Sequence, residues 1–299
     1  MRPTTIGEST LKTKAFVYYH QGMTDLVVCM GLIDHYSSLY DEVLVFLRSD
    51  VRDMMDFYLR GKDNVEPIYF KGDDGRYYGT IEKSLSIDRF HYSSANNGSL
   101  LLNPEYVMCT HGEHDKWRED KLGMRWYNCF VANRLLPGTF KVPHFTEAFY
   151  EYYNLSFWKR ITDFNIERDT ELEDAAYEKF IKEHGEDYVL YHDDQKREET
   201  KGVGVPYKST HIELDRKEGV SYVNLNKATN TFFDYIKIIE NAQEIHVVDS
   251  VWACLIYQLD CRYGTLNNTM DQKTVNVYCQ RGHYEIFKNP VTLPNWNLI

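Results

Sequence analysis

The chain lacks two features, an excess of positive charge and a long apolar run, and each absence excludes a class of protein. Its 299 residues carry 34 Lys and Arg against 45 Asp and Glu, which gives a net charge of −11. Proteins that bind nucleic acid or an anionic membrane surface need a basic face, so neither partner is expected. No segment approaches the roughly 18 consecutive apolar residues of a membrane span. The first residues, MRPTTIGESTLKTK, also lack the apolar core of a signal peptide, and we therefore expect a cytoplasmic protein.

Paired cysteines and the common nucleotide-binding motifs are missing as well. The six cysteines are scattered without a CxxC pair, and several lie in apolar segments, which favours reduced thiols in a protein core. The stretch HQGMTD, residues 20–25, has neither the Gly-Lys-Ser ending of a P-loop nor the GxGxxG pattern of dinucleotide-binding loops. Function therefore has to be argued from other features of the chain.

Two blocks of alternating strands and helices are present, and this alternation predicts an α/β fold with parallel, doubly wound sheets. The chain is 43% hydrophobic and can bury a substantial core. In the first block, Thr24 or Asp25 is expected to cap one helix and Ser49-Asp50 a second. The expected strands of this block are 15–19, 41–49, 64–70 and 104–109.

The second block follows a charged helix expected over 166–187. Its expected strands are 188–194, 209–215, 244–250 and 274–281, and its expected helices are 230–243 and 251–259. The two blocks predict two Rossmann-like domains, 1–175 and 176–282, the first of which includes an aromatic-rich helical region. The tail, 283–299, is expected to pack back on the first domain. Ligands of such sheets bind beyond the carboxyl ends of the strands, which directs attention to the turns there.

The segment IHVVDSVWACLIYQL, residues 245–259, is the sharpest local signal. An apolar strand ends at Asp249-Ser250, and a helix begins at once with Val251. The N–H groups of the first helical turn, the positive end of the helix dipole and the Ser250 hydroxyl would together bind an anion such as a nucleotide diphosphate. The alternative is that Asp249 or Ser250 is only an N-cap.

Charged residues follow the strand at 188–194. The turn contains Lys196 and Arg197, which either hold a phosphate or belong to a solvated loop. It also contains His192 and the pair Asp193-Asp194, which superficially resembles the acidic metal motif of metal-dependent sugar transferases.

Histidines and aromatic residues mark a further turn, THGEHD, residues 110–115. His111 and His114 have the spacing of metal ligands, but no third strong ligand is near in the sequence, so no metal is expected. These histidines are expected to contact a substrate or to face solvent. Trp117 opens an aromatic cluster that either packs in a core or stacks on sugar rings.

The stretch HQGMTD could be a turn that only joins a strand to a helix, or it could be part of an active site. Gly22 permits a close approach of the backbone or a positive φ. Asp25 would lie near a helix amino terminus, where a carboxylate is stabilised in its charged form, as a general base requires. The alternative interpretation of Asp25 is again a capping residue.

Two of these stretches resemble a known family when they are taken together. YHQGMTDLVVCMGLIDHY, residues 19–36, resembles the first strand, loop and helix of the heptosyltransferase-like GT-B glycosyltransferases, and IHVVDSVWACLIYQL is similar to their late Asp-Ser or Asp-Thr motif. The similarity is greater to glycosyltransferases of large DNA viruses and of bacterial surface-polysaccharide clusters. Segments that resemble FYEYYNLSFWKRITDFNIERD and YVLYHDD occur in that group. A virus-encoded enzyme would work in the host cytoplasm.

The resemblance implies a GT-B fold with two Rossmann-like domains facing a cleft, the first on the acceptor side. It implies a hexosyl- or pentosyltransferase that uses a UDP- or GDP-sugar and a glycan acceptor, with inversion, without metal and without a cofactor. Asp25 is then the catalytic base. The donor-side candidates are Gly22, His192, Asp194, Lys196, Arg197, Asp249, Ser250 and Val251, and the acceptor-side candidates are His20, His111 and Trp117.

The chain departs from the family pattern at two places. Thr24 stands where a glycine is usual, and Trp252, Ala253 and Cys254 replace the glycine and histidine expected after the Asp-Ser pair. These departures leave two alternatives open. One is a binding protein for nucleotide or glycan that has lost its chemistry, and the other is a two-domain nucleotide-sugar epimerase.

Overall fold

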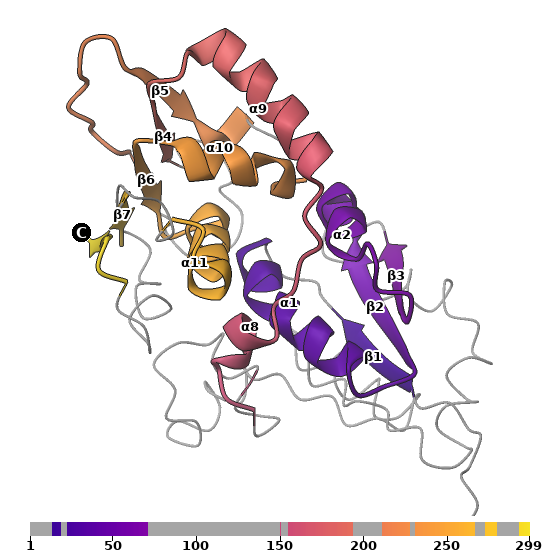
Figure 1. Cartoon of the computed structure of the whole chain (residues 1–299). Coiled ribbons are helices and arrows are strands. Elements are labelled where there is room, and N and C mark those ends of the chain that lie inside the picture. Colours follow the sequence, from indigo (N-terminus) through magenta and orange to yellow (C-terminus); the bar gives the residue numbers. More distant parts are fainter. Residues whose placement is uncertain are drawn as a thin grey trace, which may run out of the picture.

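The computed structural model of the chain contains two parallel β-sheets with helices packed between them (Figure 1). The structure describes residues 14–18, 23–70, 150, 155–193, 211–227, 231–266, 273–279 and 293–299. This arrangement confirms the predicted α/β class with parallel sheets. None of the helices in these ranges combines the length and the apolar character that a transmembrane segment requires.

The first sheet has the order β1-β2-β3, with all three strands parallel. Its elements are β1 (Lys14–Tyr18), α1 (Met23–Ser37), β2 (Glu42–Arg48), the 3₁₀ turn η1 (Ser49–Val51), α2 (Arg52–Tyr58) and β3 (Val65–Phe70). These bounds confirm three of the predicted strands, and the fourth, at 104–109, lies outside the described residues.

The caps predicted for the two helices of this half are wrong. Helix α1 begins at Met23, so Thr24 and Asp25 lie inside its first turn instead of before it. Ser49 and Asp50 form the 3₁₀ turn η1, and the N-cap of α2 is Val51, whose apolar side chain makes no capping hydrogen bond. Val51 is buried in the core, so this helix begins without the polar side-chain cap that the sequence suggested.

The second sheet has five parallel strands in the order β5-β4-β6-β7-β8. It follows α8 (Lys159–Thr162) and α9 (Thr170–His184), whose N-cap Asp169 accepts a hydrogen bond from the Leu172 N–H. The further elements are β4 (Tyr188–His192), β5 (Ser221–Asn224), η4 (Leu225–Lys227), η5 (Phe233–Tyr235), α10 (Ile236–Asn241), β6 (Glu244–Val248), α11 (Val251–Tyr263), β7 (Thr274–Tyr278) and β8 (Trp296–Leu298).

Three predictions for this half are corrected. The strand expected at 209–215 is wrong, because residues 211–217 run without regular structure and the strand is β5. The helix expected over 230–243 is divided into η5 and α10 after Phe232, which has a positive φ of 66°. The tail does not end on the first half, since β8 pairs with β7 and completes the second sheet.

The hydrophobic core of the described residues is continuous across both halves. Helix α1 packs on α8 and α11, and α2 packs on η5, where the Phe233 ring stacks on Phe57 and Tyr58 at centroid distances of 5.4 and 5.9 Å. A Cβ atom at Gly31 would lie 2.6 Å from the Lys159 carbonyl oxygen, so only glycine lets α1 and α8 approach this closely. Two domains separated by a cleft therefore stay a prediction.

The segment that joins the halves is held from the first half by buried polar contacts. The Asp34 carboxylate on α1 accepts hydrogen bonds from the Asn165 N–H at 2.7 Å and from the Tyr58 hydroxyl, and it lies 3.0 Å from Lys62 Nζ. Burial raises the pKa of Asp34, although Lys62 and these hydrogen bonds oppose the shift. The end of α1 is thereby fixed against the connecting segment.

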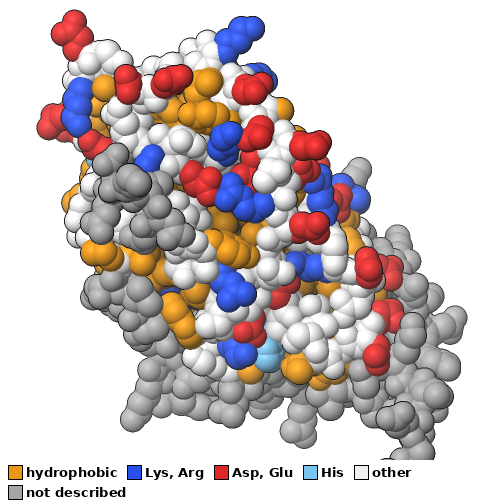
Figure 2. All heavy atoms as spheres, in the orientation of Figure 1, with side chains coloured by type: hydrophobic (Ala, Val, Ile, Leu, Met, Phe, Trp, Pro, Cys, Tyr) orange, Lys and Arg blue, Asp and Glu red, His pale blue; other side chains and the backbone are white. Residues whose placement is uncertain are grey.

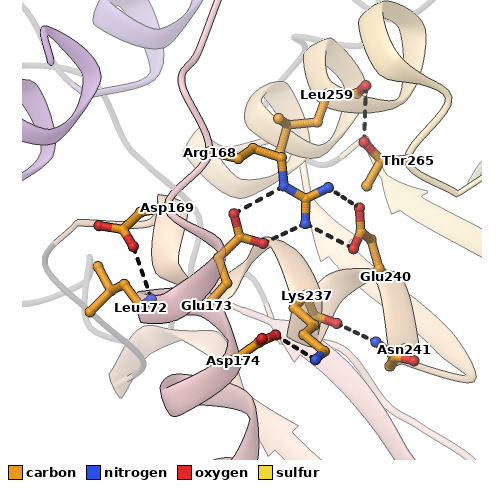
Figure 3. Close-up of polar contacts among 10 residues, drawn as sticks. All are labelled: Arg168, Asp169, Leu172, Glu173, Asp174, Lys237, Glu240, Asn241, Leu259 and Thr265. Carbon is orange, nitrogen blue, oxygen red and sulfur yellow. Dashed lines mark hydrogen bonds and ion pairs between the residues drawn. The ribbon is translucent and has the colours of Figure 1, made fainter. Parts of the chain in front are cut away.

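From the second half, Arg168 holds the same segment (Figure 3). Its guanidinium donates from Nε to Glu173 Oε1 at 3.0 Å and from Nη1 to Glu240 Oε1 at 2.6 Å, which joins α9 to α10. A second, more exposed ion pair lies nearby, in which Lys237 Nζ is 2.5 Å from Asp174 Oδ1. On the face shown in Figure 2, acidic and basic side chains are interspersed instead of gathered by sign.

Candidate functional site

The strand order of the second sheet locates a candidate binding edge. From β4 the chain moves outward to β5 and then returns to the other side of β4 as β6, so the order reverses between β4 and β6. Ligands of open parallel sheets bind beyond the carboxyl ends of the strands at such a switch point. His192, the last residue of β4, pairs in register with Val247 of β6, and Asp249-Ser250 follows β6 directly.

Ser250 and His192 are joined across this switch point. The Ser250 Oγ lies 2.9 Å from His192 Nδ1, and both residues are buried. The Ser250 carbonyl accepts the first helical hydrogen bond of α11 from the Cys254 N–H at 3.0 Å, but its side chain makes no capping hydrogen bond. Ser250 is thus the N-cap of α11, as the alternative interpretation expected, but it caps the helix through its backbone and not through its side chain.

The start of α11 keeps the properties of an anion site as a consequence. The hydroxyl of Ser250 does not occupy the N–H groups of the first turn, and these groups carry the positive end of the helix dipole. Asp249 is buried, and its N–H donates to the Tyr278 carbonyl at the end of β7 at 3.3 Å. Val251 is also buried as the first residue of the helix.

A second group of polar residues surrounds Asp193, immediately after β4. The carboxylate of Asp193 is 1% exposed, accepts a hydrogen bond from Asn224 Nδ2 at 2.9 Å, and lies 3.2 Å from His211 Nδ1. Its carbonyl oxygen accepts from Asn226 Nδ2, and the Asn226 N–H donates to Asn224 Oδ1 at 2.8 Å. Residues from the ends of β4 and β5 are thus tied together on the same edge as Ser250.

His211, Asn224 and Asn226 were not identified from the sequence. The misplaced strand at 209–215 put His211 inside a strand, and the short β5, SYVN, has only four residues and no long apolar run. A signal was nevertheless present, since the Asn-Leu-Asn sequence of residues 224–226 places polar side chains after a β-branched strand.

The structure brings four of the predicted site residues together at this edge, namely His192, Asp249, Ser250 and Val251. The backbone of Asp25 lies in the first turn of α1, a helix that packs on α11, and its side chain is not among those described. The other predicted site residues lie outside the described residues: His20, Gly22, His111, Trp117, Asp194, Lys196 and Arg197.

The acidic pair that suggested a metal motif is engaged in part by protein groups. Asp193 is held by Asn224 and His211, and within the described ranges no three His, Cys, Asp or Glu side chains gather as metal ligands would. Asp194 lies outside those ranges. The described geometry of Asp193 therefore fits a hydrogen-bonding role.

Comparisons with known proteins give one similarity of fold. No protein-family model matches the chain, and no curated protein matches it. Among solved structures, the chain is similar to the crystal structure of a glycosyl transferase of family 9 from Veillonella parvula DSM 2008, with a TM-score of 0.48 and 10% identity, over 89% of this chain and 80% of that chain. A likeness at this level carries no argument for the reaction. The resemblance to viral and surface-polysaccharide enzymes stays a prediction.

Proposed function

We propose that the protein is a glycosyltransferase that moves a sugar from a UDP- or GDP-sugar to a hydroxyl group of a glycan acceptor. The observation that carries this proposal is the start of α11. It lies at the switch point of a parallel sheet, and the Ser250 hydroxyl bonds to His192 instead of capping the helix. A helix start of this kind fits a diphosphate, because its N–H groups and its dipole both favour negative charge.

The donor side would consist of the switch point and the turn after β4. The diphosphate would contact the N–H groups that begin at Val251, next to Asp249 and Ser250. Lys196 or Arg197 would neutralise the charge that develops on the leaving diphosphate, while Asp194 and the loop glycine Gly22 would complete the donor pocket. These cations and the helix dipole would supply the charge stabilisation that a metal provides in other transferases.

The acceptor side would belong to the first half of the chain. Asp25, in the first turn of α1, would remove the proton of the acceptor hydroxyl. The acceptor oxygen would form a bond to the anomeric carbon as the bond from that carbon to the phosphate oxygen breaks, with the bonding electrons leaving on the nucleoside diphosphate. Direct displacement of this kind inverts the anomeric centre. His20, His111 and Trp117 would contact the acceptor.

A ligand panel tests the proposal. A thermal-shift series with UDP, GDP and their sugars should show one nucleotide that raises the melting temperature strongly, because a ligand at 100 times its Kd stabilises a protein by about 2.7 kcal/mol. The stabilisation and the slow release of nucleoside diphosphate from the matching donor should both persist in EDTA. If no nucleoside diphosphate stabilises the chain, the proposal is wrong.

Two other outcomes point to the alternatives. Nucleotide binding without any turnover of donor would favour a binding protein on the same fold. Conversion of the sugar while it remains attached to the nucleotide would favour an epimerase. Loss of transfer in EDTA, with recovery on adding manganese, would contradict the metal-independent mechanism and would direct attention to Asp194.

A further inference from the structure

We infer that Gly31, in the middle of α1, is a positioning residue for sugar transfer, because it sets the distance from α1 to the helices α8 and α11. The inference rests on the proposed function, in which Asp25 in the first turn of α1 is the base and the start of α11 binds the donor diphosphate. Its basis is the contact between the backbones of α1 and α8 at Gly31.

The contact at Gly31 leaves no room for a side chain. A Cβ atom at this position would lie 2.6 Å from the Lys159 carbonyl oxygen and 2.8 Å from the Arg160 Cα atom. Both are backbone atoms of α8, so no change of rotamer can move them away. Because Cβ atoms in proteins keep at least 3.0 Å from such atoms, any larger residue would force the two helices apart by several tenths of an ångström.

Helix α8 passes this constraint on to α11. The Arg160 side chain is fully buried, and its guanidinium carbon lies 5.2 Å from the centre of the Tyr257 ring on α11 and 4.3 Å from that of Phe157, which precedes α8. Helices α8 and α11 also pack on each other, and α1 packs on both. Close-packed interiors transmit small displacements instead of absorbing them, so a shift of one of these helices is felt by the other two.

The three helices connect the two sides of the proposed site. Figure 1 shows the first part of α1 beside α11, so the turn that contains Asp25 and the start of α11 belong to helices in direct contact. In reactions that depend on orientation, a misplacement of about 1 Å can lower the rate about 10²-fold. Separation of α1 from α8 by several tenths of an ångström would therefore slow transfer without removing any group that binds the donor.

Donor turnover in Gly31→Ala tests the inference. The assay uses the UDP- or GDP-sugar that the wild type cleaves, with water in place of the acceptor hydroxyl. The single-turnover rate of nucleoside diphosphate release should fall about tenfold in the variant. The Kd for the same nucleoside diphosphate should stay nearly unchanged in isothermal titration, because the start of α11 is intact. Alanine favours a helix more than glycine does, and saturating nucleotide stabilises the fold by mass action, so the folded variant can be assayed.

Two further variants separate positioning from a loss of stability. Leu32→Ala is the matched control, because Leu32 is the next residue of α1 and is fully buried, and its truncation weakens the core without adding an atom between the helices. This control should lower the melting temperature more than Gly31→Ala and leave the rate of release unchanged. Gly31→Ser adds one more atom at the contact and should lower the rate further than Gly31→Ala.

The outcomes distinguish this inference from the proposed function. A wild-type rate in Gly31→Ala, a lost affinity for the nucleotide in that variant, or an equal fall of the rate in Leu32→Ala would each overturn the inference and leave the proposed function intact. A wild type that releases nucleoside diphosphate from no UDP- or GDP-sugar would instead refute the proposed function, and the inference with it.

Discussion

The Ser250 hydroxyl and the His192 imidazole form a buried hydrogen bond of 2.9 Å between the start of α11 and the end of β4. This contact replaces the capping hydrogen bond that a serine at the start of a helix normally makes. It places a hydroxyl and a helix dipole between β4 and β6, where the order of the described strands reverses. Because the Ser250 side chain bonds to His192 and not to its own helix, the two residues are best tested as a pair.

The pair should behave as a coupled unit in nucleotide binding. Ser250→Ala should weaken nucleoside diphosphate binding about tenfold, and His192→Leu should have a similar effect, because either change removes the same hydrogen bond. The double variant should be little worse than either single one, so isothermal titration should give a non-additive cycle. His192→Asn keeps a polar group near the Nδ1 position and should be milder.

Ser49→Ala provides the control for this cycle, since Ser49 follows β2 in the first sheet as Ser250 follows β6 in the second. Its affinity for nucleotide should equal that of the wild type. Strictly additive losses for Ser250 and His192 would show that the two residues act separately and would contradict the coupling.

Asp25 should be required for transfer but not for donor binding. Asp25→Asn should lower kcat by about 10²- to 10⁴-fold, the usual contribution of a general base, with the Kd for the nucleotide nearly unchanged. Loss of a carboxylate from the first turn of α1 should cost only about 0.3–1 kcal/mol of stability, so a melting curve distinguishes a catalytic effect from unfolding. Asp53→Asn, at an exposed acid in the first turn of α2, is the matched control. Full activity in Asp25→Asn would remove it from the mechanism.

The sequence predicted most of the strands because buried parallel strands are short apolar runs with polar ends. The runs at 188–192 and 244–248 have this form, and the helix after Ser250 was predicted to begin where α11 begins. The short strand β5 was missed because it lacks this apolar pattern. Its four residues are only partly buried, since β5 lies at an edge of the sheet.

Contacts between distant residues explain what the sequence could not predict. The bond between His192 and Ser250 spans 58 positions, and that between His211 and Asp193 depends on an irregular segment that lies beside the end of β4. Likewise, β8 joins the second sheet through pairing with β7, which local periodicity does not encode. Local patterns thus located the elements and the turns, whereas the partners of each polar side chain required the fold.

Arg168 should matter for stability far more than the neighbouring Lys237. The Glu173 side chain is 1% exposed, so Arg168→Leu leaves a buried carboxylate without its main partner. The expected loss is roughly 2–3 kcal/mol, below that of a fully buried pair because Arg168 is 36% exposed. Lys237→Leu should have a much smaller effect, since Lys237 and Asp174 both face solvent.

Urea denaturation of the two variants measures this difference. Glu173→Gln should recover part of the loss in the Arg168→Leu background, because the burial that raises the pKa of Glu173 also penalises its charge. Equal destabilisation by the Arg168 and Lys237 changes would mean that the contacts drawn in Figure 3 do not hold the connecting segment.

Asp34 should give the stability of the protein a pH dependence of definite sign. Burial raises its folded pKa above the ordinary value of 3.8, against the opposing effects of Lys62 and the hydrogen bonds from Tyr58 and Asn165. Between 3.8 and the raised value, the folded state binds more protons than the unfolded state, so the free energy of unfolding contributed by Asp34 falls as the pH rises. Asp34→Asn removes this contribution.

The measurement is the difference in unfolding free energy between the wild type and Asp34→Asn, followed from acidic to neutral pH. That difference should decrease with rising pH, because titratable groups that do not interact with Asp34 contribute equally to both proteins. Asp163 supplies the opposite case: burial alone would raise its pKa, but hydrogen bonds from Lys159, Thr162 and His35 outweigh burial and hold the pKa below 3.8. For Asp163→Asn the same difference should increase with pH through the range below 3.8, because the unfolded state then binds more protons. A decrease with pH for both variants would show that the contacts of Asp163 do not stabilise its charged form.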